Sequence, residues 1–292
     1  MAKVHPTRST HPPAASRNKL LAALPKADYA RISPLLTTVP LTFKRILHKQ
    51  GSRIDTVYFP NGGVCSVTNV MSDGRMVEVA TIGNEGMVGI TIFLGGEIAA
   101  GEAFVQVPDG EALAMSADNF RRELDRHGPF YDLMSRYSQA FQALIMQSTA
   151  CNSLHTVEER ASRWLLMTHD RAGSDEFQLT HEFLGYMLGV RRPTVSLVLG
   201  TLDKAGAISN GMKKIRIVNR ERLEGTACEC YDVVRRTFER LFPPPTRLEN
   251  CGKLSANGQL FRPWRFSLEI LSHDFCSLGS GPCQPPPGGT AC

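Results

Sequence analysis

The segment 178–222 carries the most restrictive pattern in this 292-residue chain. Thr180 can cap a helix over 181–188, Gly189 permits a sharp turn, and a second helical pattern runs from Arg191 to about Lys204 with a proline in its first turn. A capping hydroxyl, a turn glycine and an early proline are the local signals for where helices start and stop. The segment therefore predicts two short helices that meet at a glycine turn.

A basic hairpin is expected directly after these helices. Asn210-Gly211 predicts a tight turn, and residues 213–217 alternate basic and apolar side chains as a half-buried strand does. Helix, turn, helix and hairpin in this order predict a winged helix-turn-helix. Residues 189–222 hold eight basic and two acidic side chains, a net charge of +6 against +5 for the whole chain. Because cationic side chains release counterions from phosphates, we expect this segment to bind double-stranded DNA.

The residues that would contact DNA follow from this geometry. A recognition helix enters the major groove by its N-terminal end, and a wing lies along the DNA backbone. The predicted DNA-binding residues are Thr180, Arg191, Arg192, Thr194, Ser196, Lys213, Lys214 and Arg216. Leu197 is expected to pack inward, with contact to a thymine methyl group as the alternative.

The N-terminal half has a different pattern. Short β-rich runs over 39–115 are separated by turn signals such as Asp73-Gly74, which predicts a tight hairpin within a β-roll or sandwich. Short helices broken at Pro25 and Pro34 are expected to lead into it. The pattern leaves open whether the roll encloses a pocket or a packed interior.

From about Ser116 onward, glycine and proline become sparse and a long helix is expected. Apolar residues recur there with alternating spacings of four and three, which predicts a coiled-coil seam and a homodimer. The seam residues are Phe130, Met134, Tyr137, Phe141 and Leu144. A second row, Leu133, Ala140 and Ile145, could pack against the roll. A long core helix in a monomer is the alternative.

The expected fold class is α+β, with a jelly roll, a long dimerisation helix and a winged helix-turn-helix in series. Thr156 and Glu159 form a capping-box pattern, so a helix is expected to start there. The predicted organisation is a disordered arm (1–17), a β-roll with its helical lead-in (18–116), the dimerisation helix (117–154), the DNA-binding domain (155–225), a C-terminal helix (226–242) and a disordered tail (243–292).

Composition favours a cytoplasmic protein. No apolar run approaches the roughly 20 residues of a membrane span, and the N-terminus has no apolar signal region. The cysteine spacing does not resemble a disulfide framework, so reduced thiols are expected. Cys228 and Cys230 are two apart with no second pair or nearby histidine, which is a weak metal signal. We therefore expect neither a metal nor a cofactor.

Residues 184–196 have the sequence LGYMLGVRRPTVS. Mainly through these residues, the chain resembles the Crp/Fnr family of bacterial transcription regulators. The resemblance extends over about 20–241 and includes Val57-Tyr58-Phe59-Pro60 and Cys228-Glu229-Cys230-Tyr231. It implies a cyclic-nucleotide-binding-like jelly roll, a long dimer helix and a winged helix that binds palindromic promoter DNA. It also makes RNA polymerase a candidate partner.

The resemblance has departures at the effector site. Members that bind cyclic nucleotides hold the phosphate with a Gly-Glu loop and an Arg-Ser pair. The loop has a counterpart in Gly83, Asn84, Glu85 and Gly86, which could offer N–H groups to an anion or form a plain structural turn. At the place of the Arg-Ser pair stands Gly101-Glu102, whose carboxylate repels a phosphate. We therefore expect an effector other than a cyclic nucleotide, and the lack of cysteines before Cys65 argues against an iron-sulfur cluster.

The sequence bears on two other functional classes, an enzyme and a protein-binding scaffold. The chain has no phosphate-binding Gly-rich loop, no His-Glu-x-x-His and no Gly-x-Ser-x-Gly motif, so no enzyme is expected. In the recognition helix, Pro193 and Leu197 replace the Glu and Arg that read bases in cyclic-AMP-responsive members. The operator should accordingly differ. A dimeric sensor or scaffold that binds a partner protein and has lost specific DNA binding is the alternative.

Overall fold

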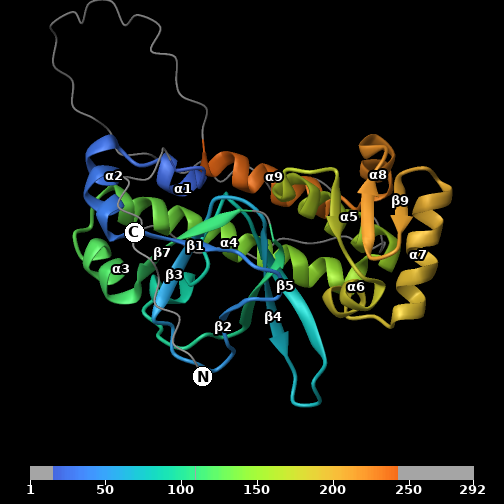
Figure 1. Cartoon of the computed structure of the whole chain (residues 1–292), viewed down its shortest axis with the longest axis horizontal. Helices are drawn as coiled ribbons and strands as arrows, with labels where there is room; N and C mark the ends of the chain where they lie inside the picture. Colours follow the sequence, from blue (N-terminus) through green and yellow to red (C-terminus); the bar gives the residue numbers. More distant parts are fainter. Residues whose placement is uncertain (1–15, 109, 243–292) are drawn as a thin grey trace, which may run out of the picture. The chain divides into compact units, whose positions relative to one another are not determined.

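The computed structural model describes residues 16–108 and 110–242 and combines sheets and helices in the predicted α+β fold (Figure 1). The predicted tail 243–292 and most of the predicted arm 1–17 lie outside the described residues. Among the described helices, none is both long enough and apolar enough to cross a membrane.

The helical lead-in is confirmed and consists of α1 (Lys19–Ala22), α2 (Lys26–Ile32) and the 3₁₀ helix η1 (Ser33–Leu35). Asn18 fixes it to the rest of the molecule. Its side-chain oxygen accepts from the Leu21 N–H, and its amide nitrogen donates to the carbonyls of Pro60 (2.9 Å) and Gly86 (2.8 Å). Asn18 is fully buried, so each of these bonds satisfies a group that water cannot reach.

The β-roll is built from two antiparallel sheets. One has the order β1-β7-β3 and the other β2-β6-β4-β5. The strands are β1 (Thr37–Pro40), β2 (Ile46–His48), β3 (Thr56–Pro60), β4 (Val64–Val70), β5 (Met76–Ile82), β6 (Glu102–Val107) and β7 (Glu111–Ser116), with the 3₁₀ helix η2 (Ile90–Ile92) between β5 and β6. The predicted hairpin at Asp73-Gly74 joins β4 to β5, and Gly74 takes the left-handed φ of 81° that this turn needs.

The predicted helix over 117–154 is two helices, α3 (Ala117–Leu124) and α4 (Pro129–Leu154). The break has a local cause. Gly128 is extended, and Pro129 follows it in the first turn of α4, where its missing N–H does no harm. A proline at this place starts a new helix and cannot continue the old one.

The predicted dimer seam is wrong, because its five side chains are buried inside their own chain. They are Phe130, Met134, Tyr137, Phe141 and Leu144, each at most 8% exposed. α4 packs on β5 and on the C-terminal helix α9 (Cys230–Leu241), which lies alongside it in Figure 1. The Tyr137 ring lies 6.4 Å from that of Phe238 on α9. Apolar spacing shows that a helix face is covered, but it does not show what covers it.

The DNA-binding domain starts at the predicted capping box, in which Thr156 and Glu159 satisfy each other's backbone N–H groups. Its strands form a sheet of order β8-β10-β9. The elements are α5 (Val157–Ala172), β8 (Glu176–Gln178), α6 (His181–Leu188), α7 (Arg192–Lys204), β9 (Ile208–Gly211), β10 (Lys214–Ile217) and α8 (Arg220–Thr226). The C-terminal helix predicted over 226–242 is the shorter α9.

Two buried polar contacts join the β-roll to α5. The Trp164 indole N–H donates to the Glu78 carboxyl over 2.8 Å, and Arg171 pairs with Glu85 over 2.7 Å. Burial raises the pKa of Glu78 to about 7, although hydrogen bonds from Ser66 and Trp164 favour its charged form. Polar groups buried between two domains fix how the domains contact each other, because a separated group would be left unpaired.

Candidate DNA interface and effector pocket

The two predicted helices and their glycine turn are confirmed. The Thr180 hydroxyl accepts from the Phe183 N–H and caps α6, which ends at Gly189 with a left-handed φ of 65°. In α7 the expected inward stripe, Val195, Val198, Leu199 and Leu202, is buried. This packing fixes the axis of α7 and turns its opposite side toward solvent.

The N-terminal end of α7 is exposed where a recognition helix needs free donors. Arg191, Arg192 and Thr194 are all exposed, and neither arginine forms an ion pair within the described residues. Leu197 is 73% exposed, so the expectation that it packs inward is wrong. It lies outside the buried stripe of α7, and on this exposed side it can meet a thymine methyl group.

The wing is confirmed, but its turn lies two residues later than predicted. Asn210 and Gly211 belong to β9, and Lys214 of β10 pairs with Gly211. The turn is Met212-Lys213, with Lys213 at a φ of 63°. The strand register decides this, because Ile208, Ile215 and Ile217 must all point into the core.

A groove lies between the start of α7 and the wing. Thr180, Arg192 and Lys213, all predicted from the sequence, line it together with the wing turn. Lys213 forms no ion pair among the described residues, so it and Arg192 present free cations to the groove. One carboxylate, that of Glu182, also lines the groove, so the two cations leave it with a net positive charge that suits a DNA backbone.

Two of the predicted wing cations are already paired. Glu176 on β8 binds Lys214 over 2.8 Å and Arg216 over 3.0 Å. The hydrogen bonds from these two cations lower the pKa of Glu176. Sequence reasoning missed Glu176, because it lies outside the basic segment and meets the wing only through the β8–β10 pairing. Lys214 and Arg216 therefore contribute less free positive charge than their number suggests.

His181 also escaped the sequence analysis. Its Nδ1 lies 2.8 Å from the Ser196 hydroxyl and its Nε2 lies 3.1 Å from the Asn210 side-chain oxygen. The histidine thus links α6 to α7 and to the wing. The Ser196 hydroxyl donates to the Arg192 carbonyl. Ser196, which was predicted to contact DNA, therefore already has hydrogen-bond partners within the domain.

Comparison with known proteins identifies both halves of this arrangement. A family model for the Crp-like helix-turn-helix domain matches residues 159–226, and one for the cyclic nucleotide-binding domain matches residues 41–127. The chain belongs to the Crp/Fnr family of transcription regulators. No curated protein matches its sequence. The match to a DNA-binding domain gives no support to the scaffold alternative.

Solved structures show the same Crp/Fnr fold. A Crp/Fnr-family regulator from Eubacterium rectale has a TM-score of 0.57 and 18% identity, over 71% of this chain and 96% of its own. The c-di-GMP-responsive regulator CLP from Xanthomonas campestris has a TM-score of 0.55 and 14% identity, over 66% and 99% of the two chains. FixK2 from Bradyrhizobium japonicum has a TM-score of 0.52 and 20% identity, over 66% and 98%.

The loop predicted as a possible ligand site, Gly83 to Gly86, is partly closed by its own hydrogen bonds in this Crp/Fnr chain. The Gly83 N–H donates to Glu85, the Gly86 N–H donates to the Gly83 carbonyl, and the Met87 N–H donates to the Tyr137 hydroxyl. The Asn84 carbonyl accepts from Lys19. The Gly83 and Gly86 N–H groups are thus not free to bind an anion, whereas those of Asn84 and Glu85 have no hydrogen-bond partner among the described residues.

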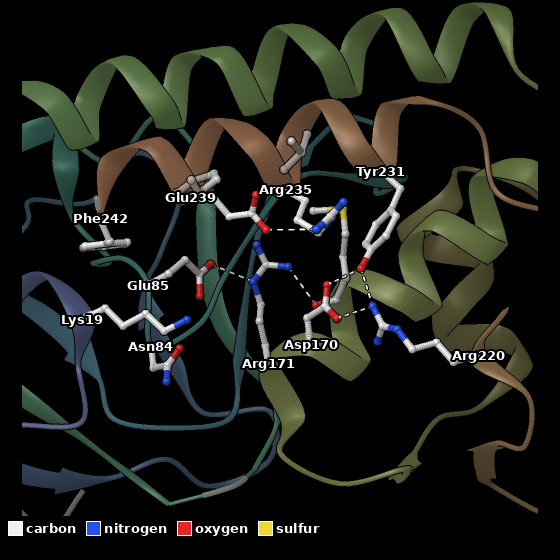
Figure 2. Close-up of a pocket in the computed structure, with 13 residues that line it drawn as sticks. Lys19, Asn84, Glu85, Asp170, Arg171, Arg220, Tyr231, Arg235, Glu239 and Phe242 are labelled. Atoms are coloured by element: carbon white, nitrogen blue, oxygen red, sulfur yellow. Dashed lines mark hydrogen bonds and ion pairs between the residues drawn. The ribbon is translucent and has the colours of Figure 1, made fainter. Parts of the chain in front are cut away.

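A cavity of about 590 Å³ lies beside this loop, within the size range of small-molecule sites (Figure 2). Figure 2 shows most of its charged groups in pairs and Lys19 without a partner. Arg171 meets Glu85, Arg220 meets Asp170 over 2.7 Å, and the Tyr231 hydroxyl donates to Asp170. Three of the four cations that line the cavity are paired, whereas Lys19 forms no ion pair among the described residues, so the cavity carries a small excess of positive charge.

The cysteine pair near the C-terminus is not isolated. The sequence analysis found no further ligand beside Cys228 and Cys230, but the fold brings Cys151 and His155 to them. These two residues are one helical turn apart at the end of α4. The spacing of Cys151 and His155 was the only sign of a metal site in this part of the sequence. Sequence alone could not show that these two residues meet a cysteine pair more than seventy residues away.

Proposed function

We propose that this regulator binds palindromic promoter DNA as a homodimer, with the start of α7 in the major groove and the wing on the backbone. The observation that carries the proposal is the exposure of Arg191 and Arg192, unpaired within the described residues, at the first turn of a helix packed by its opposite face. Arginine is the side chain that most often reads guanine in the major groove. The proposal includes a cytoplasmic location, where the bacterial chromosome lies, and RNA polymerase, which occupies promoters, as a second partner.

The homodimer is supported by the free face of α4. Ala143, Met146, Ala150 and Leu154 are exposed there with spacings of three and four. Met146 is 66% exposed and Leu154 80% exposed, and with Ala143 and Ala150 they form one apolar row on this face. A symmetric pair of α4 helices would cover this row and set two α7 helices on half-sites about one DNA turn apart.

The signal is proposed to pass through the β4–β5 hairpin. A cleft at the tip of this hairpin is lined by Asp73 and Arg75 on one side and by Arg191 and Thr194 on the other. An effector that moves the β-roll would therefore change the position of α7 relative to α4. The carboxylate of Glu102 argues for an effector other than a cyclic nucleotide. No catalytic activity is proposed.

DNA binding is tested with the full chain and fluorescent duplexes. We expect measurable affinity for random duplex that falls steeply as salt rises, and selection from random DNA should yield a palindrome. Arg192→Ala should weaken operator binding by about 1–3 kcal/mol and random binding much less. Arg53→Ala is the matched control, since Arg53 is exposed on the β-roll. Negligible binding to every duplex at low salt would overturn the proposal.

The dimer is tested by Met146→Glu with sedimentation velocity. Charge on the exposed row should convert the dimer to a monomer and abolish operator binding, because one half-site contact alone is weak. Ile46→Glu provides the control, since Ile46 is 53% exposed but lies on β2. A dimer that survives Met146→Glu and binds the operator normally would place the interface elsewhere.

A further inference from the structure

Three cysteines and one histidine meet where α4 ends and α9 begins. Cys151 lies in the last turn of α4, His155 directly follows it, and Cys228 and Cys230 come from the loop after α8 and the start of α9. Their ligand atoms, three Sγ and one imidazole nitrogen, all lie within 4.8 Å of one another. The three cysteines are at most 6% exposed and carry free thiols.

The distances match the edges of a metal tetrahedron. Zn–S bonds of about 2.3 Å and Zn–N bonds of about 2.0–2.1 Å give S···S edges of about 3.8 Å and S···N edges of about 3.5 Å. The Cys151 and Cys228 sulfurs are 3.5 Å apart, and Nδ1 of His155 is 3.5 Å from the Cys230 sulfur. An iron-sulfur cluster spreads its ligands over several irons, whereas this spacing fits one ion. We propose that Cys151, His155, Cys228 and Cys230 bind a single Zn²⁺ in a closed, structural site.

The surrounding side chains orient the proposed ligands. Glu229 lies 3.3 Å from Nε2 of His155, which turns Nδ1 toward the sulfurs. A carboxylate on the far nitrogen is the usual partner of a metal-bound imidazole. Gln147 donates from its amide nitrogen to the Cys230 sulfur over 2.9 Å, as a donor to a thiolate does.

Charge balance also favours the loaded site. Three thiolates, a neutral imidazole and Zn²⁺ leave one net negative charge. Arg160 and Arg163 on α5 are each only 8% exposed, and among the described residues neither forms an ion pair. Their Nε groups have no hydrogen-bond partner there. Buried cations are ordinarily compensated. Glu78 lies near Arg163, and the proposed anionic metal site would add compensating charge for both arginines, which lie close enough to Cys151 to interact with it electrostatically.

The site would join the long helix to the far end of the DNA-binding domain. α4 ends at Leu154 and α5 begins at Val157, so the chain bends between these two residues. A bound ion would clamp this bend to the segment after the wing. Loading would thereby fix the position of the DNA-binding domain relative to α4.

The test uses the full chain purified under a thiol reductant with no affinity tag. Its background variant replaces the four cysteines outside the described residues, Cys251→Ser, Cys276→Ser, Cys283→Ser and Cys292→Ser, so that they cannot contribute. We expect one zinc per chain by elemental analysis. Replacement by Co²⁺ should give intense visible bands of tetrahedral geometry and thiolate charge-transfer bands in the near ultraviolet.

In this background, Cys228→Ser should lose at least tenfold in affinity for Co²⁺, and His155→Asn should keep a cobalt spectrum that has changed in shape. Cys65→Ala is the matched control, since Cys65 is buried in the β-roll, and it should bind like the background. Circular dichroism identifies a variant that fails to fold. If a variant does fail, it is set aside, and the cobalt spectrum of the background variant alone tests the proposal. Absence of a tetrahedral spectrum, bound iron with sulfide, or a Cys151–Cys228 disulfide under reductant would each overturn the proposal.

Discussion

Glu78 should make the stability of this protein depend on pH. The carboxyl lies on β5, is only 9% exposed, and accepts hydrogen bonds from Ser66 (2.6 Å) and Trp164 (2.8 Å). Burial raises its pKa from an ordinary 4.5 to about 7. Glu78→Gln keeps the shape and the acceptor for Trp164 but cannot ionise, so it isolates the effect of the charge.

The size of the effect follows from this difference. At about 1.36 kcal/mol per pKa unit, a rise from 4.5 to about 7 corresponds to about 3 kcal/mol. Because the folded pKa is the higher one, the folded protein holds the proton more tightly than the unfolded chain. The protonated Glu78 carboxyl therefore stabilises the folded protein fully below about pH 4.5, and this stabilisation is lost as the pH rises through about 7. At about pH 8, Glu78→Gln should be more stable than the wild type by up to about 3 kcal/mol.

The assay is urea unfolding at about pH 5 and about pH 8, followed by far-ultraviolet circular dichroism because the chain contains a second tryptophan, Trp264. The free energy of unfolding of Glu78→Gln should exceed that of the wild type by a large amount at about pH 8 and by a small amount at about pH 5. Glu111→Gln, at an exposed position of β7, should show no such difference. Equal effects of Glu78→Gln at both pH values, or a greater loss at about pH 8, would refute the reasoning.

Three further predictions concern single contacts. Arg171→Met leaves the Glu85 carboxylate buried and unpaired, so it should cost about 3–5 kcal/mol in urea unfolding, and Glu85→Gln in the same chain should recover part of it. Gly189→Ala forces a side chain into a left-handed turn and should lower stability by about 1–2 kcal/mol, a loss that thermal unfolding would detect. Glu176→Gln releases two wing cations, so affinity for random duplex should rise several-fold with a steeper salt dependence; an unchanged salt slope would contradict this.

Structural features that depend on residues close together in the chain could be predicted from the sequence. The Thr180 cap, the Gly189 turn and the capping box at Thr156 and Glu159 all form as expected, because each depends on backbone geometry within a few residues. The hairpin at Asp73-Gly74 is of the same kind. The exposed arginines of α7 follow from these local signals and the apolar stripe.

Features that depend on distant partners were decided by the tertiary structure. The apolar face of α4 was correctly expected to be buried, but its cover is α9 and β5 rather than a second chain. The wing turn moved from Asn210-Gly211 because the core fixes the strand register. The Cys151, His155, Cys228 and Cys230 cluster arises only because α9 returns along α4. The spacing of residues in the sequence indicates which side chains share one face of a helix or strand. Only the packing of the folded chain determines which residues lie against that face.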